Sequence, residues 1–164
     1  MADSPVQSHG RVPTPGPIPT RAADSRLRSA SRAAGRLVLA GFLILAGVSH
    51  LGWAREAFRA QVPAWLPLDV DFVIVASGLV EIGLGLGLLL LTRRRVALGW
   101  IVAAFFVAIF PGNVSQFATG TDSFGLNSDV SRGIRLLFQP LLVLWALWST
   151  GAWRAWRESR RRVK

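Results

Sequence analysis

The sequence predicts an all-α integral membrane protein built as a four-transmembrane-helix bundle. Hydrophobic residues make up 51% of the 164-residue chain, although its formal net charge is +10. The nineteen basic residues, all but one of them arginine, gather at the borders of apolar stretches. Between residues 72 and 91 a single charge, Glu81, interrupts the apolar sequence. Twenty helical residues span roughly 30 Å, which is the thickness of a bilayer's hydrocarbon core.

The first segment, residues 1–35, is rich in proline, serine and arginine and contains almost no large apolar side chains. Such a segment cannot bury enough surface to offset the entropy of ordering, so we expect a disordered basic N-terminal tail. The first transmembrane helix is expected at about 37–53. Charged residues before a short apolar run are also typical of a signal peptide. The tail is long for that role and no convincing cleavage site follows, so a retained helix is favoured.

The next segment, residues 54–71, carries several charges together with Pro63 and Pro67 and is too polar to span a membrane. We expect an interfacial loop with Trp65 at the level of the lipid headgroups, where tryptophan is enriched. The second helix follows at 72–91.

Three consecutive arginines, Arg93 to Arg95, separate the second apolar run from the third. A continuous helix would place these charges inside the membrane, so a tight hairpin is expected, with the third helix at 96–112. Pro111 and the glycine after it should end or kink that helix. A polar loop follows at 119–131, and the fourth helix is expected at 134–153.

The orientation of the four-helix domain, residues 36–153, follows from its basic residues. Fifteen of them lie in the N-terminal tail together with Arg36, in the arginine hairpin and in a basic C-terminal tail at 154–164, against four in or beside the other two loops. The positive-inside rule therefore predicts cytoplasmic N and C termini in a multi-pass protein of the plasma (inner) membrane. The basic C-terminal tail should contact anionic headgroups of the lipid bilayer.

Polar residues from all four predicted helices fall in the outer half of the membrane in this topology. Glu81 lies about nine residues, or roughly 14 Å, from the outer end of its helix. A carboxylate at that depth is costly and needs a partner or a proton. If the helices form one bundle, a shared pocket or polar network is expected. Its candidate residues are His50, Glu81, Asn113, Arg135 and Gln139.

Each candidate also has a structural interpretation, which the sequence leaves open. Glu81 can form an interhelical hydrogen bond that only stabilises the bundle, and His50 can be solvated at the interface. Asn113 can cap a helix end, and Gln139 can satisfy backbone groups freed by Pro140.

The second helix is rich in small residues, which allow close approach of helix backbones in lipid. Gly78 and Gly85 share the face of Glu81, whereas Gly83 and Gly87 lie roughly opposite. We therefore expect this helix to contact neighbours on two sides.

Several function classes are excluded or disfavoured. The chain has no cysteine, which rules out disulfides, thiolate metal ligands and thiol redox chemistry by the chain itself. Its two histidines are far apart in the sequence, so no metal site is expected. The arginines do not form the basic stripe of a soluble nucleic-acid-binding fold, so no nucleic-acid partner is expected. The glycines of the second helix lack the spacing and the preceding strand of a nucleotide-binding loop.

Several motifs, in their order and spacing, resemble the DoxX-like family of small membrane proteins. They cover about residues 35–150 and read LAGVSHL (45–51), VPAWLP (62–67), SGLVEIGLGLGLLL (77–90), IFPGNV (109–114) and IRLLFQPLLVLWAL (134–147), together with the arginine hairpin. The chain has Gly112 where that family usually has alanine, and Leu51 where an aromatic residue often stands.

The resemblance implies a four-helix membrane protein, with relatives linked to quinone-coupled oxidation or to membrane-associated oxidoreductase complexes. We therefore expect an accessory subunit of such a system, without independent catalytic activity, that binds a quinone or a similar small amphipathic molecule. A partner oxidoreductase and a homo-oligomer are further expectations. The alternatives are a non-catalytic scaffold or assembly factor and a small proton-linked transporter.

Overall fold

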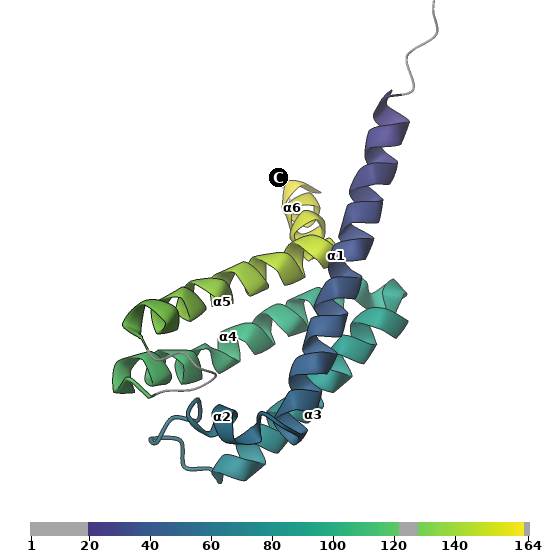
Figure 1. Ribbon diagram of the computed structural model, residues 1–164. Coiled ribbons are helices and arrows are strands. Elements are labelled where there is room, and N and C mark those ends of the chain that lie inside the picture. Colours follow the sequence, from purple (N-terminus) through teal and green to yellow (C-terminus); the bar gives the residue numbers. More distant parts are fainter. Residues whose placement is uncertain (1–19, 122–127, 163–164) are drawn as a thin grey trace, which may run out of the picture.

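The computed structural model describes residues 20–121 and 128–162, and every secondary-structure element in those ranges is helical (Figure 1). Four helices are long and apolar enough to cross a membrane. They are α1 (Thr20–Leu51), α3 (Val70–Leu90), α4 (Arg95–Thr119) and α5 (Asp129–Thr150). Short elements connect or follow them, namely α2 (Arg55–Arg59), the 3-10 turn η1 (Thr92–Arg94) and α6 (Ala152–Arg162). The predicted all-α class and the four long apolar helices are thus confirmed.

The four long helices pack as two pairs. Helix α1 runs along α3, and α4 runs along α5. The pairs are joined where α1 contacts α5 and where α3 turns into α4 through η1 (Figure 1). Away from that turn α3 and α4 have little contact, so the two pairs diverge.

Close approach of α1 and α3 depends on glycine. A Cβ atom at Gly47 would lie 2.5 Å from the carbonyl oxygen of Gly78, and one at Gly85 would lie 2.8 Å from that of Ala40. Both distances are shorter than real carbon–oxygen contacts, so only glycine allows this separation. The opposite face of α3 differs from the expectation: Gly87 contacts Leu98 of α4, but Gly83 faces open space.

The apolar core lies in the half of the bundle nearer the arginine hairpin. It is formed by Leu39, Leu43, Leu88, Val102 and Phe106, among others. Large apolar side chains also cover the outer faces of the long helices, for example Leu79 and Leu137, which are mostly exposed. Side chains of this kind on the outside of a bundle are suited to contact with lipid tails.

The N-terminal expectation was wrong for residues 20–35. The last proline of that segment is Pro19, and α1 begins at the next residue. Alanine, arginine and leucine, which favour helices, follow it. The composition of residues 1–35 taken as a whole does not show this change after Pro19. Residues 1–19 lie outside the described part of the chain.

Three later helix boundaries also differ from the prediction. Helix α4 continues through Pro111 and ends at Thr119, seven residues later than expected. Gly120 caps it, with a φ of 65° that suits glycine. Helix α5 begins at Asp129, because Ser128 and Ser131 form a reciprocal cap at its start. It ends before Gly151, with a φ of 76°, and the expected basic tail forms α6.

Candidate functional site

A cavity of about 840 Å³ lies between the two helix pairs, in the half of the molecule away from the apolar core. We call it the main cavity. All four long helices and the connection from α1 to α3 contribute to its wall. All five residues predicted as a polar cluster line it: His50, Glu81, Asn113, Arg135 and Gln139. The structure therefore brings together side chains that are as much as 89 positions apart in the sequence.

His50 and Glu81 meet across the α1–α3 contact. Nδ1 of His50 lies 3.0 Å from Oε2 of Glu81, within ion-pair distance, and 2.8 Å from the carbonyl oxygen of Ala46. Only the contact with Ala46 has hydrogen-bond geometry. Because a carbonyl oxygen can only accept, Nδ1 must carry a hydrogen and donate it there. Glu81 is only 6% exposed, and its Oε2 has no hydrogen-bond partner in the described structure.

A phenyl ring from α2 covers His50. The rings of His50 and Phe58 stack with their centroids 3.4 Å apart and their planes 16° from parallel. Sequence analysis missed Phe58, because it placed residues 54–71 in a loop without internal structure. The helical turn of α2 presents this ring to the cavity.

The connection that carries Phe58 is fixed at two places. Arg59 donates to both carboxylate oxygens of Asp71, at 2.6 and 2.7 Å, and Arg55 donates to one of them at 3.3 Å. The hydrogen bonds to Asp71, and then its charge, raise the pKa of Arg59 above its ordinary value, so this arginine stays charged. On the α4 side, the carbonyl of Gln61 rests against Gly112, where a Cβ atom would collide with it. The connection thus spans the cavity from α3 to α4.

Asn113 and Gln139 link α4 to α5. The Asn113 amide donates to Oε1 of Gln139 at 2.9 Å, and Nε2 of Gln139 donates to the Phe106 carbonyl at 2.6 Å. Asn113 therefore does not cap a helix end, since α4 continues beyond it. Gln139 does not bond the backbone of its own helix before Pro140 but crosses to its neighbour. Both alternatives that the sequence left open for these residues are wrong.

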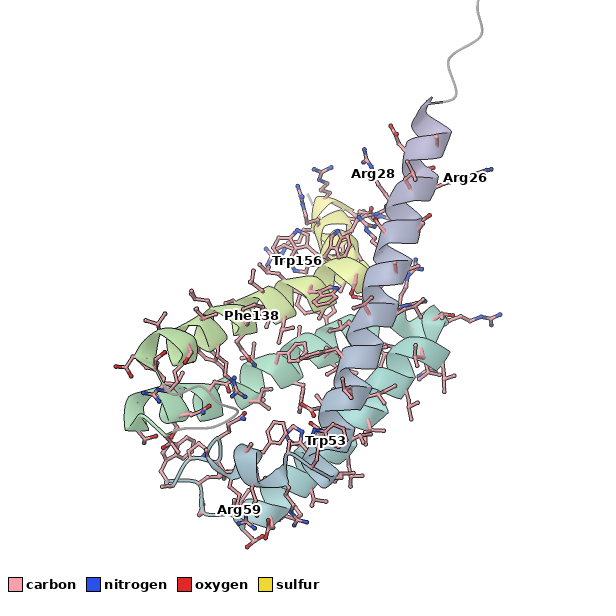
Figure 2. All side chains as sticks on the ribbon, viewed as in Figure 1. Arg26, Arg28, Trp53, Arg59, Phe138 and Trp156 are labelled. Carbon is pink, nitrogen blue, oxygen red and sulfur yellow. The ribbon has the colours of Figure 1, made fainter. Side chains whose placement is uncertain are left out.

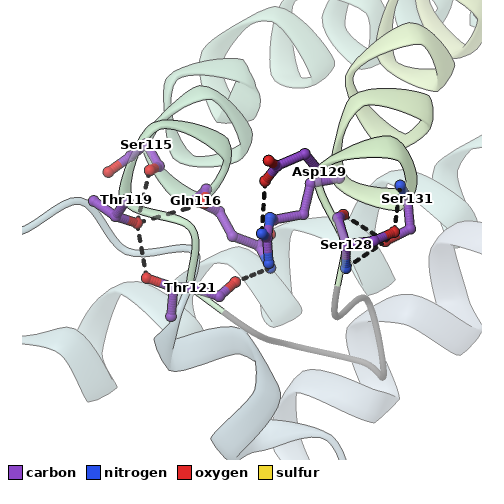
Figure 3. A network of polar contacts seen from close by, with 8 residues as sticks. Ser115, Gln116, Thr119, Thr121, Ser128, Asp129 and Ser131 are labelled. Carbon is purple, nitrogen blue, oxygen red and sulfur yellow. Dashed lines mark hydrogen bonds and ion pairs between the residues drawn. The ribbon is translucent and has the colours of Figure 1, made fainter.

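Arg135 reaches a second polar group at the far end of α4 and α5. Its Nη1 donates to Oε1 of Gln116 at 3.3 Å, and the Gln116 amide donates to the Thr121 carbonyl at 3.2 Å. Figure 3 shows the hydrogen bond between Gln116 and Thr121 with the polar contacts around it. Close by, Nη2 of Arg132 donates to Asp129 at 2.8 Å. Gln116 is only 2% exposed. Gln116 lies three residues after Asn113, so the two share a helix face if α4 continues past Pro111. With that continuation, the sequence would have indicated Gln116 as a member of the polar cluster.

The remaining wall of the main cavity is mostly apolar and aromatic. Figure 2 shows Phe138 on α5 and Trp53 just after α1. Both line the cavity, as do Phe42, Ile74, Phe106, Ile109, Leu142 and Trp145. A few polar groups in an apolar wall suit a ligand that is itself amphipathic.

The helices and the cavity define the class: the chain has the features of a multi-pass membrane protein with an internal, mainly apolar cavity. The chain belongs to the family of the domain of unknown function DUF8561, which matches residues 39–150. That range includes all five predicted site residues. No curated protein and no solved structure matches the chain. The family match does not assign the chain to the DoxX-like proteins, and that resemblance stays a hypothesis.

Proposed function

We propose that this protein is an accessory membrane subunit that binds a small amphipathic molecule of the quinone class in its main cavity. In this proposal it serves a membrane-associated oxidoreductase, as its resemblance to DoxX-like proteins implies. It lies in the plasma membrane with both termini in the cytoplasm, in accord with the distribution of its arginines.

The observation that carries the proposal is the unsatisfied Oε2 of Glu81. A buried carboxylate oxygen without a donor costs free energy, and the cost is greater inside a bilayer. Glu81 lines the main cavity, whose volume of about 840 Å³ lies within the range of small-molecule sites, roughly 300–1,000 Å³. A ligand hydroxyl group, such as that of a quinol, would supply the missing donor.

The opposite wall of the cavity supports the same ligand class. Arg135, on α5, offers a guanidinium group that can donate to a carbonyl oxygen. The rings of Phe58, Phe106 and Phe138 line the same cavity and provide apolar surface. A quinone has a flat ring with oxygen atoms at its two ends. Its oxygen atoms would therefore meet the polar side chains of the cavity, and its ring would meet the apolar side chains.

A thermal-shift experiment with a short-chain ubiquinone tests the proposal on the full chain in detergent. We compare the wild type with Glu81→Gln and with Glu158→Gln, which makes the same chemical change at the exposed helix α6. The quinone should raise the unfolding temperature of the wild type and of Glu158→Gln, and the shift should be lost in Glu81→Gln. A folded Glu81→Gln protein with an unchanged shift would rule out Glu81 as a contact.

Two other outcomes distinguish the alternative functions. If Glu81→Gln does not fold while Glu158→Gln does, the carboxylate is structural, as expected of a scaffold or assembly factor. If the wild type shows no quinone shift but supports proton-coupled uptake in vesicles that Glu81→Gln abolishes, the transporter function is favoured.

A further inference from the structure

A second, smaller pocket lies at the other end of the bundle, in the angle between α1, α5 and α6. It encloses about 200 Å³ and has two arginines in its wall, Arg32 from α1 and Arg154 from α6. The rest of the wall is Leu144, Leu147, Trp148, Gly151 and Trp153. We call it the arginine pocket. It is separate from the main cavity, because the two share no lining residue.

We propose that the arginine pocket binds the phosphate headgroup of an anionic phospholipid, with the lipid's acyl chains along α5. The two ends of the pocket match the two parts of such a molecule. Arg32 and Arg154 supply donors for phosphate oxygens. Leu144, which is 58% exposed, continues the apolar surface of α5 toward the membrane interior.

The charge around the pocket also favours an anion. Residues 23–36 and 152–162 contain nine arginines and only two acidic residues. One of the acids, Glu158, accepts a hydrogen bond from Nε of Arg154 at 2.8 Å, so the rest of that guanidinium group can still donate. Arg32 forms no ion pair within the part of the chain that the structure describes. One helical turn further, Arg36 has a buried Nε without an acceptor.

The depth of the pocket agrees with a headgroup position. Trp148 and Trp153 in its wall, and Trp156 next to it on α6, are each about half exposed. Tryptophan at this exposure is typical of the membrane–water interface. The pocket is held together where α1 crosses α5: Trp145 donates to the Gly35 carbonyl at 3.1 Å, and the Trp148 ring packs against Gly35. The site is thus built by tertiary contacts that hold Arg32 near α5 and α6.

Lipid binding to the purified full chain tests this site. The pocket variant is Arg32→Gln/Arg154→Gln, and the control is Arg26→Gln/Arg161→Gln, which removes the same charge from the same two helices outside the pocket. Figure 2 shows Arg26 on the part of α1 that extends beyond the bundle. Native mass spectrometry counts lipids retained after incubation with dioleoylphosphatidylglycerol or dioleoylphosphatidylcholine micelles. Thermal shifts with the same lipids and with inorganic phosphate are measured in parallel.

We expect the wild type to retain phosphatidylglycerol in preference to phosphatidylcholine, and the pocket variant to bind phosphatidylglycerol at least about fivefold more weakly than the control variant. Equal losses in both variants would show diffuse attraction to the basic surface and overturn the site. A shift of equal size with inorganic phosphate alone would show a free-anion site instead of a lipid site. If the double variant does not fold, the single variants Arg32→Gln and Arg154→Gln decide, because each must weaken phosphatidylglycerol retention.

Discussion

Nδ1 of His50 and Oε2 of Glu81 lie 3.0 Å apart without a hydrogen bond between them. The imidazole hydrogen is directed to the carbonyl of Ala46, within its own helix. The pair therefore adds little directional bonding between α1 and α3, whose contact depends on glycine packing. This geometry separates the His50–Glu81 pair from the interactions that hold α1 against α3.

The first prediction concerns the cost of keeping Glu81. A buried carboxylate oxygen without a hydrogen-bond donor carries a desolvation cost, which an apolar residue of similar volume does not have. We expect Glu81→Leu to unfold in detergent at the wild-type temperature or above it, while His50 keeps its bond to Ala46. A clear loss of stability in Glu81→Leu would show that the carboxylate is a structural part of the α1–α3 contact.

The second prediction uses two glycines of α3 that lie two positions apart. A Cβ atom at Gly85 would lie 2.6 Å from Cγ1 of Ile44, whereas one at Gly83 meets nothing within 4 Å. Gly85→Ala should therefore lower the free energy of unfolding by about 1–3 kcal/mol, because α1 must move away. Gly83→Ala should be neutral or stabilising by up to about 1 kcal/mol, because alanine favours helix. Denaturation in mixed micelles compares them, and equal effects would contradict this account of the packing.

The sequence predicted the grouping of the five polar residues for a physical reason. Antiparallel spans of similar length place each residue at a depth that can be counted from the helix ends, and polar groups in a bilayer avoid lipid. Glu81 and His50 could therefore be assigned to the same half of the membrane from their positions in the sequence. The pairing of Asn113 with Gln139 was not predicted, because it depends on how α4 and α5 are rotated against each other.

Other parts of the site depend on boundaries that the sequence could not locate. Pro111 normally ends or kinks a helix, yet α4 continues to Thr119, and this continuation places Gln116 beside Arg135. Likewise, Phe58 stacks on His50 only because residues 55–59 form a helical turn. Tertiary contacts determine both the continuation of α4 and the helical turn at 55–59. Such contacts cannot be inferred from the pattern of residue types along the sequence.

The third prediction tests the link between α4 and α5. Asn113→Ala and Gln139→Ala should each destabilise the protein, because each leaves a buried polar group without its partner. The double variant should lose less than the sum of the single losses, with a coupling free energy of about 0.6–1.7 kcal/mol, as found for interhelical hydrogen bonds in membranes. Strictly additive losses in a double-mutant cycle would contradict a direct bond between the two side chains.

The fourth prediction concerns the connection over the main cavity. Asp71 holds both Arg55 and Arg59, whereas the exposed Glu56 pairs with Arg59 alone. Asp71→Asn should therefore speed hydrogen exchange in residues 54–69, and Glu56→Gln should have a much smaller effect. The four long helices should keep their protection in both variants. If the two variants exchange alike, Asp71 does not fix this segment.

The fifth prediction tests the proposed orientation, and the absence of cysteine from the sequence makes it a simple experiment. A single cysteine at Leu68, an exposed loop position, should lie outside the cell, and one at the exposed Ser159 of α6 should lie in the cytoplasm. A membrane-impermeant maleimide added to intact cells should label the Leu68→Cys variant and leave the Ser159→Cys variant unlabelled until the cells are lysed. The reverse pattern would place the arginine-rich end of the bundle outside and invert the topology.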